Sequence, residues 1–510
     1  MGAIVLTGIP ADYALPGNYV ETNLGVGPVS GSDVSYPILL VGNKTTAGDA
    51  TPDTTVYGPT SALPLQTEQD CINRFGAGSE IHRAFLRVTD PIRGAGNQTT
   101  AVYAIAVTES VGVAASLIIT YATNAIAPGG STRIWVGDEF VDVPVATGDT
   151  PTVIAANAVL AVNAKTKWAV TATSALGVLT LTAKNKGLRG NWLRGQATIS
   201  SAISTTVSGA LVPTYFTGGT VADDSTAALA TLASQRFYYN VSAAEDAVQF
   251  GALATQVAAQ ALPAVGQRMR CFGGSIDTQA NAITIASGRN AARGEYVNIP
   301  AADWTPFEIA AHAAACYARL ETKPKPRHNF SGFGNGPNEN AIWKLPAPRS
   351  GATQTAAQLN TAIKNGLTPI GVNANGSTYI VKRCTTKCLN GANPDFRSRD
   401  AHKVTVTDFF ADDWYAKLNA QFSGKDLTDD PSQGQHVPGA SVATPSTIKG
   451  ALFQLIDLYN NNDQLQAADT IKKNAVVQRE VTPTTRASAR VPLTVIDILD
   501  QTTTALDQVG

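Results

Sequence analysis

The residues best suited to hold a metal ion are Cys384 and Cys388, which lie four positions apart in "RCTTKC". A structural zinc ion needs four ligands, which sequences supply as closely spaced pairs of cysteine and histidine. The next candidate, His402, follows Cys388 by fourteen positions and has no second ligand at such a spacing. We therefore predict two ordinary core or strand-end cysteines and no metal site, with a metal ion held by this pair as the alternative.

Two glycine-containing segments have some features of phosphate-binding loops. "GNKTTAG" follows an apolar run, but Gly42 stands only two residues before Lys44, so the Gly-x4-Gly-Lys-[Ser/Thr] pattern is missing. "SGFGNGP" has alternating glycines, but Pro337 stands where a dinucleotide-binding loop would begin its helix. We expect both segments to be turns, and we predict no bound cofactor.

The residues that could catalyse a reaction are not arranged as a catalytic group. Ser79 and Ser275 lack the Gly-x-Ser-x-Gly pattern of a nucleophile elbow, and no histidine or aspartate can be assigned to either. The paired aspartates at 412–413 and 429–430 are adjacent in sequence, so their side chains diverge and are expected to be solvated. The sequence therefore predicts no catalytic residue and a protein that is not an enzyme.

The composition favours a protein whose surfaces meet other proteins. The chain has 510 residues, enough for three to four structural units. Charged residues make up 15%, below the usual share of about 25%, so less of the surface is committed to water. The net charge of −1 without a basic block predicts no direct nucleic-acid binding, and the absence of a long apolar run predicts no membrane anchoring. No secretory signal is expected, and the five cysteines are expected to be reduced.

Patterns along the chain indicate alternating strands and helices. Residues 38–41 form an unbroken apolar run, typical of a strand buried on both faces. Thr305, Pro306 and Glu308 have the spacing of a helix start, with the threonine as N-cap. Between 101 and 212 the pattern changes to short hairpins with turns near Gly137 and Gly177, which predicts a small inserted α+β domain.

The two ends of the chain indicate extended arms. Residues 1–24 are rich in glycine and proline and contain the strand-like pair Tyr19 and Val20. The final segment is apolar and β-branched, which suits a pleated sheet, and such a segment needs a partner in its own fold or in a neighbouring molecule. The residues predicted to make contacts between subunits are Tyr19, Val20, Leu493, Val495, Ile496, Ile498 and Leu499.

The chain resembles the tail sheath proteins of contractile bacteriophages, most closely the Mu-like branch. The resemblance rests on "LPGNYVE" (15–21), "RFGAGSEIHRAF" (74–85), "NQTTAVYAIAV" (97–107), "GLTPI" (366–370), "YIVKRCTTK" (379–387) and the terminal "RVPLTVIDILD". These motifs occur in the family's order over essentially the whole chain. The motif residues expected to matter for the core are Phe75, Gly76, Gly78, Ser79, Arg383, Thr385 and Thr386.

The resemblance implies a fold with several parts. The core is an α/β domain of the topology called subtilisin-like in this family, here without a catalytic triad, and it is joined by an inserted α+β domain, an α+β C-terminal subdomain and terminal β-arms. The expected boundaries are 1–24 for the N-terminal arm, 25–100 for the first part of the core, 101–212 for a peripheral insertion, 213–400 for the rest of the core, 401–487 for the C-terminal subdomain and 488–510 for the C-terminal arm.

The resemblance also implies a function as a structural subunit of a virion tail sheath, assembled in the cytoplasm of the host bacterium. Copies would stack as hexameric rings around the tail tube, linked by β-strand exchange, and would contract to drive the tube through the host envelope for genome ejection. The implied partners are further copies of the chain, the tail tube protein, the baseplate and the tail terminator. The alternatives are the sheath of a tailocin or other contractile injection system, a subtilisin-like hydrolase, and a non-contractile surface or adhesin protein.

Overall fold

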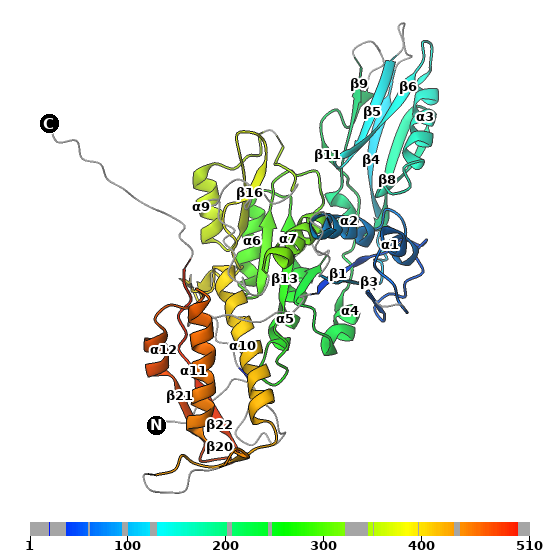
Figure 1. Cartoon of the computed structure of the whole chain (residues 1–510). Coiled ribbons are helices and arrows are strands. Elements are labelled where there is room, and N and C mark those ends of the chain that lie inside the picture. Colours follow the sequence, from blue (N-terminus) through cyan, green and yellow to red (C-terminus); the bar gives the residue numbers. More distant parts are fainter. Residues whose placement is uncertain are drawn as a thin grey trace, which may run out of the picture.

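The computed structural model describes residues 20, 37–59, 62–93, 100–122, 130–200, 207–242, 247–321, 345–349, 351–395, 397–432 and 439–497. These residues form an elongated molecule with an α/β core in the middle, a β-rich domain at one end and a helical subdomain at the other (Figure 1). None of the helices in these ranges is long and apolar enough to cross a membrane.

The core is built on an eight-stranded sheet with the order β16-β15-β14-β13-β12-β1-β3-β2. Its six inner strands are parallel, and the two short edge strands are antiparallel to their neighbours. The predicted strand at 38–41 is part of β1, which lies inside the sheet between β12 and β3 and is buried on both faces. The strands are β1 (Ile38–Asn43), β2 (Val56–Tyr57), β3 (Val102–Val107), β12 (Tyr239–Ser242), β13 (Arg270–Ser275), β14 (Gly294–Asn298), β15 (Thr368–Val372) and β16 (Thr378–Ile380).

Helices cover both faces of this sheet. Successive side chains of a strand point to opposite faces, so neighbouring residues of one strand pack against different helices. Ile38 and Leu40 pack with α1 (Glu68–Phe75), α2 (Glu80–Arg93) and α7 (Pro306–Leu320). Leu39 and Val41 pack on the other face. That face is covered by α4 (Thr226–Thr231), α5 (Ala247–Gln260), α6 (Gln279–Arg289) and α9 (Ala356–Lys364). The predicted start of α7 is confirmed, with Thr305 and Glu308 forming a capping box.

The inserted domain consists of two four-stranded sheets, with the orders β10-β4-β8-β7 and β11-β9-β5-β6, and of the helix α3 (Pro151–Asn163), whose outer side is exposed. The hairpins predicted near Gly137 and Gly177 are present as β5–β6 and β7–β8. The other elements are β4 (Ala114–Tyr121), β5 (Gly130–Val136), β6 (Glu139–Val145), β7 (Val170–Ala175), β8 (Val178–Lys186), η1 (Leu188–Trp192), β9 (Arg194–Ile199), β10 (Val207–Ser208) and β11 (Thr214–Tyr215).

The boundaries of the insertion differ from the predicted 101–212. Residues 102–107 form β3, which pairs in parallel with β1 and therefore belongs to the core sheet. At the other end, β11 pairs with β9 and Thr217 bridges to Ser116, so the chain returns to the core only after residue 217. The mistake arose because β3 and the strands of the insertion share the same Val/Ala/Ile-rich composition.

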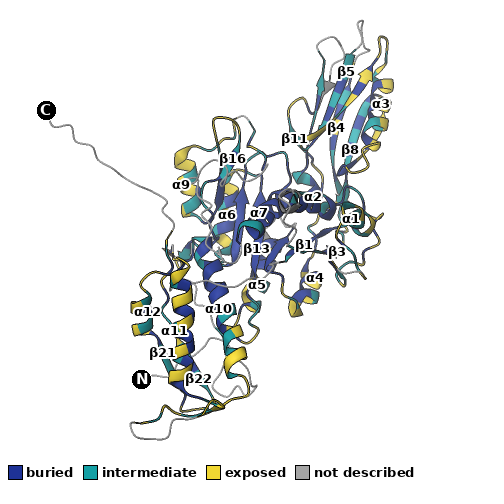
Figure 2. Ribbon diagram, in the orientation of Figure 1, coloured by how far each residue is buried: buried dark blue, intermediate teal, exposed yellow. Residues whose placement is uncertain are grey.

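The C-terminal subdomain is organised by two long helices, α10 (Ala401–Phe422) and α11 (Pro445–Asn461). Apolar residues of both helices meet in one cluster that includes Phe410, Trp414, Leu452 and Tyr459. Figure 2 shows that the far half of α10 and the outer side of α11 are exposed. The smaller elements are β17 (Leu389–Asn390), β18 (Asn393–Pro394), β19 (Asp426–Leu427), β20 (Val442–Ala443), α12 (Ala468–Asn474), β21 (Val476–Arg479) and β22 (Ala487–Arg490).

Candidate functional site

Arg383, from the most specific of the sequence motifs, lies at the centre of a buried cluster of charges. It follows the edge strand β16 and reaches Glu295 on β14 through two hydrogen bonds of 2.7 Å, from Nε to Oε2 and from Nη2 to Oε1. Its Nη1 pairs with Glu321, at the end of α7. The guanidinium also stacks on Tyr317, 3.8 Å from the ring centre. All four of these side chains are buried, so each must find its partners inside the protein.

A second arginine balances the charge of this cluster. Arg270, on β13, pairs with Glu295 at 2.6 Å and donates from Nη1 to the carbonyl oxygen of Ala401 at 3.1 Å. Glu321 accepts further hydrogen bonds from the hydroxyls of Tyr239 (2.6 Å) and Thr405 (3.0 Å). Two arginines thus face two glutamates. Burial by itself would lower the pKa of Arg383, but Glu295 and Glu321 outweigh it and hold that pKa well above its usual value.

The same kind of pairing continues along one face of α10. Thr405, Asp408 and Asp412 are three and four positions apart, which places them on the side that faces the core. Asp408 accepts two hydrogen bonds from Arg293, and Asp412 accepts one of 2.9 Å from Arg268. We call Arg268, Arg270, Arg293, Thr405, Asp408 and Asp412 the α10 seam. It fixes the helix, and with it the C-terminal subdomain, to the end of the core sheet at which β13 and β14 begin.

The two threonines of the same motif extend the attachment of this segment to β14. The Thr385 hydroxyl donates to the carbonyl oxygen of Ser398 at 2.7 Å. The Thr386 hydroxyl donates to the carbonyl oxygen of Ala291 at 3.1 Å and accepts from its amide at 2.9 Å. Both threonines are fully buried. Their role in this structure is to hold the segment between β14 and the start of α10.

The second motif, Phe75 to Ser79, forms the turn between α1 and α2 beneath the inserted domain. Phe75 is buried in the core, and Ser79 accepts a hydrogen bond from the amide of His82 at 3.1 Å. Gly76 and Gly78 have φ values of +83° and +74°, which favour glycine. A Cβ atom on Gly78 would lie 2.1 Å from the carbonyl oxygen of Trp168. The glycines therefore let the insertion approach the core closely.

Two further contacts fix the inserted domain to the core. At the β5–β6 turn, Asp138 accepts from Arg87 at 3.0 and 3.1 Å and from the indole of Trp304 at 2.7 Å. At the base of the domain, the buried Arg189 pairs with Glu80 at 2.7 Å and with Asp223 at 2.8 Å. The insertion is thus attached at several separate points.

The predicted C-terminal arm begins later in the chain than the sequence suggested. Leu493 and Val495 were expected to reach a neighbouring subunit, but both are buried in the cluster between α10 and α11 of their own chain. Val495 pairs with Leu465, and the amide of Ile496 donates to the carbonyl oxygen of Gln464 at 3.3 Å. The apolar, β-branched composition predicted a strand here but could not tell which sheet or cluster it joins. Ile498 and Leu499 lie outside the described residues, and the boundary expected at 488 also falls inside β22.

At the other end of the chain, Val20 is half-buried against the same cluster. Its carbonyl oxygen accepts a hydrogen bond of 2.6 Å from Arg268 of the α10 seam. Tyr19 lies outside the described residues. Residues from both ends of the chain therefore contact the C-terminal subdomain.

Within the described part of the chain, the sheet formed by β21 and β22 has unbonded edges. The amide of Glu480 donates to the carbonyl oxygen of Arg486, so in the alternating antiparallel pattern Val477, Arg479, Ala487 and Ala489 turn their backbone groups outward. No hydrogen bond joins these outward groups to another part of the described chain. All eight residues of the two strands except Ser488 retain solvent exposure. Among the described residues, both edges of this sheet are thus unpaired.

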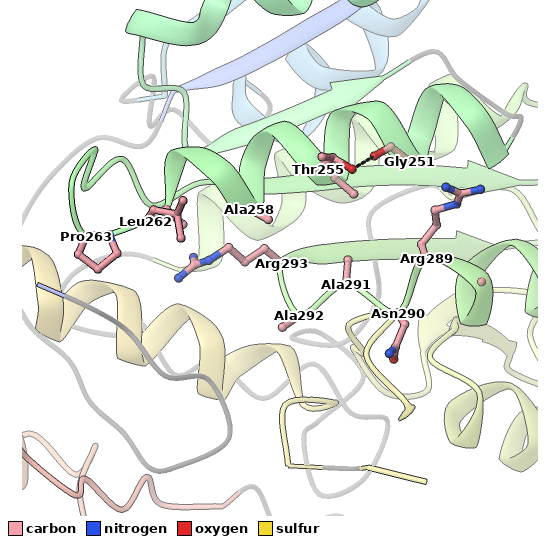
Figure 3. A pocket seen from close by; sticks show the side chains of 13 residues that line it. Gly251, Thr255, Ala258, Leu262, Pro263, Arg289, Asn290, Ala291, Ala292 and Arg293 are labelled. Atoms are coloured by element: carbon pink, nitrogen blue, oxygen red, sulfur yellow. Dashed lines mark hydrogen bonds between the residues drawn. The ribbon is translucent and has the colours of Figure 1, made fainter. Parts of the chain in front are cut away.

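A surface cavity of 510 Å³ lies between α5 and the loop that leads into β14. Figure 3 shows Ala258 of α5 and Leu262, just after this helix, on one side and Arg293 and Asn290 on the other. Arg293 is paired with Asp408, and Asn290 accepts from the amides of Cys388 and Leu389. Arg293 and Asn290 thus bond within the protein itself, so the residues that line the cavity do not indicate a particular ligand.

The two cysteines considered as metal ligands have the environment of core residues. Cys384 is fully buried, and burial raises the pKa of its thiol to about 12. Burial also raises the pKa of Cys388. Among the described residues, no group of three or more histidine, cysteine, aspartate or glutamate side chains is placed to hold a metal ion.

Sequence reasoning missed the α10 seam. A motif singled out Arg383, in the neighbouring cluster of charges, but Asp412 was expected to be solvated, whereas it pairs with Arg268 and Arg236. A usable signal was present in "RMRCFGG" and "GEYVN", where charged residues occur inside or directly before apolar strands. A charge in a buried strand requires an opposite charge from another element.

No protein-family model matches the chain, and no curated protein sequence matches it significantly. Solved structures that resemble it include the sheath tail protein of Desulfitobacterium hafniense, with a TM-score of 0.45, 11% identity, and coverage of 94% of this chain and 99% of that one. A sheath tail protein of Listeria innocua gives a TM-score of 0.44, 11% identity, and coverage of 91% and 96%. The contracted sheath of the extracellular contractile injection system PVC gives 0.47, 10% identity, and coverage of 97% and 98%. All three are described as sheath proteins, the third from a contractile injection system.

Proposed function

We propose that this chain is a structural subunit of a contractile tail sheath, in which copies are joined by exchange of β-strands. The observation that carries the proposal is the β21–β22 sheet, whose outward backbone groups are unbonded among the described residues. A long-lived monomer would be expected to cover or blunt such edges, because they invite pairing with another chain. The order of the sequence motifs given above supports the same function.

Strand addition would give both strength and register to such a polymer. An added strand forms backbone hydrogen bonds with Val477 and Arg479, or with Ala487 and Ala489, and its alternate side chains fix its position. The chain continues beyond Asp497, whose carboxylate pairs with Lys403 at the start of α10. Residues 498–510, with Ile498 and Leu499, are the segment we propose to reach the sheet of a neighbour. Because donor and acceptor surfaces differ, the contact repeats from copy to copy and does not close a dimer.

The α10 seam gives the assembly a way to transmit movement. A neighbour attached to β21–β22 would pull on the C-terminal subdomain, and the buried pair of Arg293 with Asp408 and the partly buried pair of Arg268 with Asp412 would carry that force to the core. Breaking a buried pair by removing one partner costs about 3–5 kcal/mol. Core and subdomain would therefore turn together while the exchanged strands act as hinges.

The arrangement of the copies and their partners are proposed from the family resemblance. The copies would form stacked hexameric rings around a tail tube, bounded by a baseplate and a terminator, within a virion assembled in the host cytoplasm. The core would have the family's subtilisin-like topology without hydrolase activity. The sheath of a tailocin or other injection system is the second candidate, since the same subunit geometry would serve it.

Truncation after Asp497 tests the proposal. Removing 498–510 leaves every described contact in place, so the variant is expected to melt at the temperature of the full chain but to form no tubes in negative-stain electron microscopy. The full chain under the same conditions is the control and is expected to form tubes. Tubes formed equally well by the truncated chain would contradict strand exchange through this segment.

A further inference from the structure

The inserted domain contains an edge strand that its own sequence does not protect. Edge strands are commonly kept from pairing with other chains by being very short or by carrying charges or proline. In the two sheets of the insertion, β10 and β11 have two residues each, and β6 carries Asp142 and Pro144. The fourth edge is β7, with the sequence "VTATSA", six residues without charge or proline.

The free edge of β7 is occupied by a side chain instead. Asn163, the last residue of α3, accepts a hydrogen bond from the amide of Ala172 at 2.8 Å. Its own side-chain nitrogen donates to the carbonyl oxygen of the same residue at 2.9 Å. One carboxamide thus satisfies both outward backbone groups of Ala172, as a residue of a neighbouring strand would.

The position of Ala172 makes this contact decisive for strand addition. In an antiparallel pair, residues alternate between bonding to the partner strand and facing away from it. Ala172 lies opposite Leu181 and faces away from β8, as do Val170 and Ser174 two positions on either side. An incoming strand would need all three of these outward positions, and the middle one is already bonded.

We propose that Asn163 closes the free edge of β7, so that no strand from a second copy of the chain can join the inserted domain. The closure follows from the geometry alone. Its consequence, that exchanged strands are directed to β21–β22, rests on the function proposed above. There, no comparable side-chain contact to Val477 or Ala489 occurs within the described part of the chain.

The variant Asn163→Ala tests the closure in the chain truncated after Asp497, so that the result does not depend on whether tubes form. The probe is a fluorescent peptide of the sequence "AVTATSAL", residues 169–176, whose binding is followed by anisotropy. Asn163→Ala is expected to bind it at least about tenfold more tightly than the parent chain, since a strand gains the two bonds of Ala172. Equal affinity for the two proteins would overturn the proposal.

Asn163→Asp is the matched control. Its carboxylate can still accept from the amide of Ala172 and places a charge at the edge, so the peptide is expected to bind no better than to the parent. If Asn163→Asp bound as tightly as Asn163→Ala, loss of stability would explain the binding, and the closure would be refuted. Asn163 is exposed, so neither change should unfold the domain. Serine is too short to bridge both backbone groups of Ala172, so Asn163→Ser is expected to bind the peptide as tightly as Asn163→Ala does.

Discussion

Arg293 and Asp408 form a two-point ion pair that joins the core sheet to the C-terminal subdomain, with Nη1–Oδ2 and Nη2–Oδ1 distances of 2.5 and 2.6 Å. Arg293 directly precedes β14, and Asp408 lies on the buried half of α10. Burial favours the neutral form of an arginine, but Asp408 outweighs it and raises the pKa of Arg293. The pair fixes the direction in which α10 leaves the core.

Asp408→Asn is expected to lower the free energy of unfolding by about 3 kcal/mol, because it removes the carboxylate that neutralises the buried charge of Arg293. The measurement is urea unfolding followed by circular dichroism. The matched control is Asp429→Asn, which removes a carboxylate whose side chain is 76% exposed and pairs with Arg479. That change is expected to cost less than about 1 kcal/mol. If the free energy of unfolding fell by a similar amount in the two variants, the buried pair would contribute no more to stability than the exposed one.

Gly78→Ala tests the close approach of the inserted domain to the core. Alanine at φ +74° is strained, and its Cβ would also lie 2.1 Å from the carbonyl oxygen of Trp168. Gly148→Ala is the control, since Gly148 has φ +89° with nothing within 4 Å of the added atom. We expect Gly78→Ala to be more destabilising than the control by about 1–3 kcal/mol, as overpacking usually is. If both glycines tolerated alanine equally, the steric argument would fail.

The elements were predicted well where a pattern depends on local geometry. Thr305 and Glu308 marked the start of α7 because a capping box needs only four consecutive residues. Residues 38–41 indicated a buried strand because no polar side chain interrupts them. Gly137 and Gly177 marked hairpins because tight turns favour glycine, and in the structure both residues have positive φ values. Each of these signals is contained within a few neighbouring positions.

Partners far apart in sequence were not predictable in the same way. Arg270 and Glu295 meet because β13 and β14 are adjacent in the sheet, and Arg293 meets Asp408 across 115 positions. Leu493 and Val495 are apolar, as the sequence shows, but in place of the predicted strand only Val495 forms an isolated bridge, and the pattern could not distinguish their own subdomain from a neighbouring molecule. Periodicity defines which face of an element is apolar, but it does not name what covers that face.

Acid is expected to destabilise the fold through His402, which is buried at the start of α10 and whose pKa burial lowers from 6.5 to about 3. The folded state holds the imidazole neutral. The stabilising contribution of His402 is therefore fully present above pH 6.5 and is lost as the pH falls toward 3. The loss is about 1.4 kcal/mol per pH unit within that window. His82, whose pKa burial also lowers, acts in the same direction. Urea unfolding of His402→Gln between pH 7 and 5 should show a shallower decline than the wild type, and identical slopes would contradict this role.

The open edges of β21–β22 can be tested with proline, which lacks an amide hydrogen. Ala489 and Val477 turn their amides outward, so Ala489→Pro and Val477→Pro each remove a donor from one free edge without breaking a bond between the two strands. We expect at least one of these variants to keep its melting temperature within about 4–8 °C of the wild type, a shift that corresponds to about 1 kcal/mol in a small domain, and to form no tubes in negative-stain microscopy.

Ser488→Pro is the matched control for these proline variants. The Ser488 amide faces Gln478 inside the hairpin, so proline there should lower the melting temperature more than at position 489. The comparison separates damage to the sheet from closure of its edge. If Ala489→Pro and Val477→Pro both assembled into tubes like the wild type, neighbouring copies could not be joined by backbone hydrogen bonds to either edge. The contact between subunits would then have to be made by side chains elsewhere on the molecule.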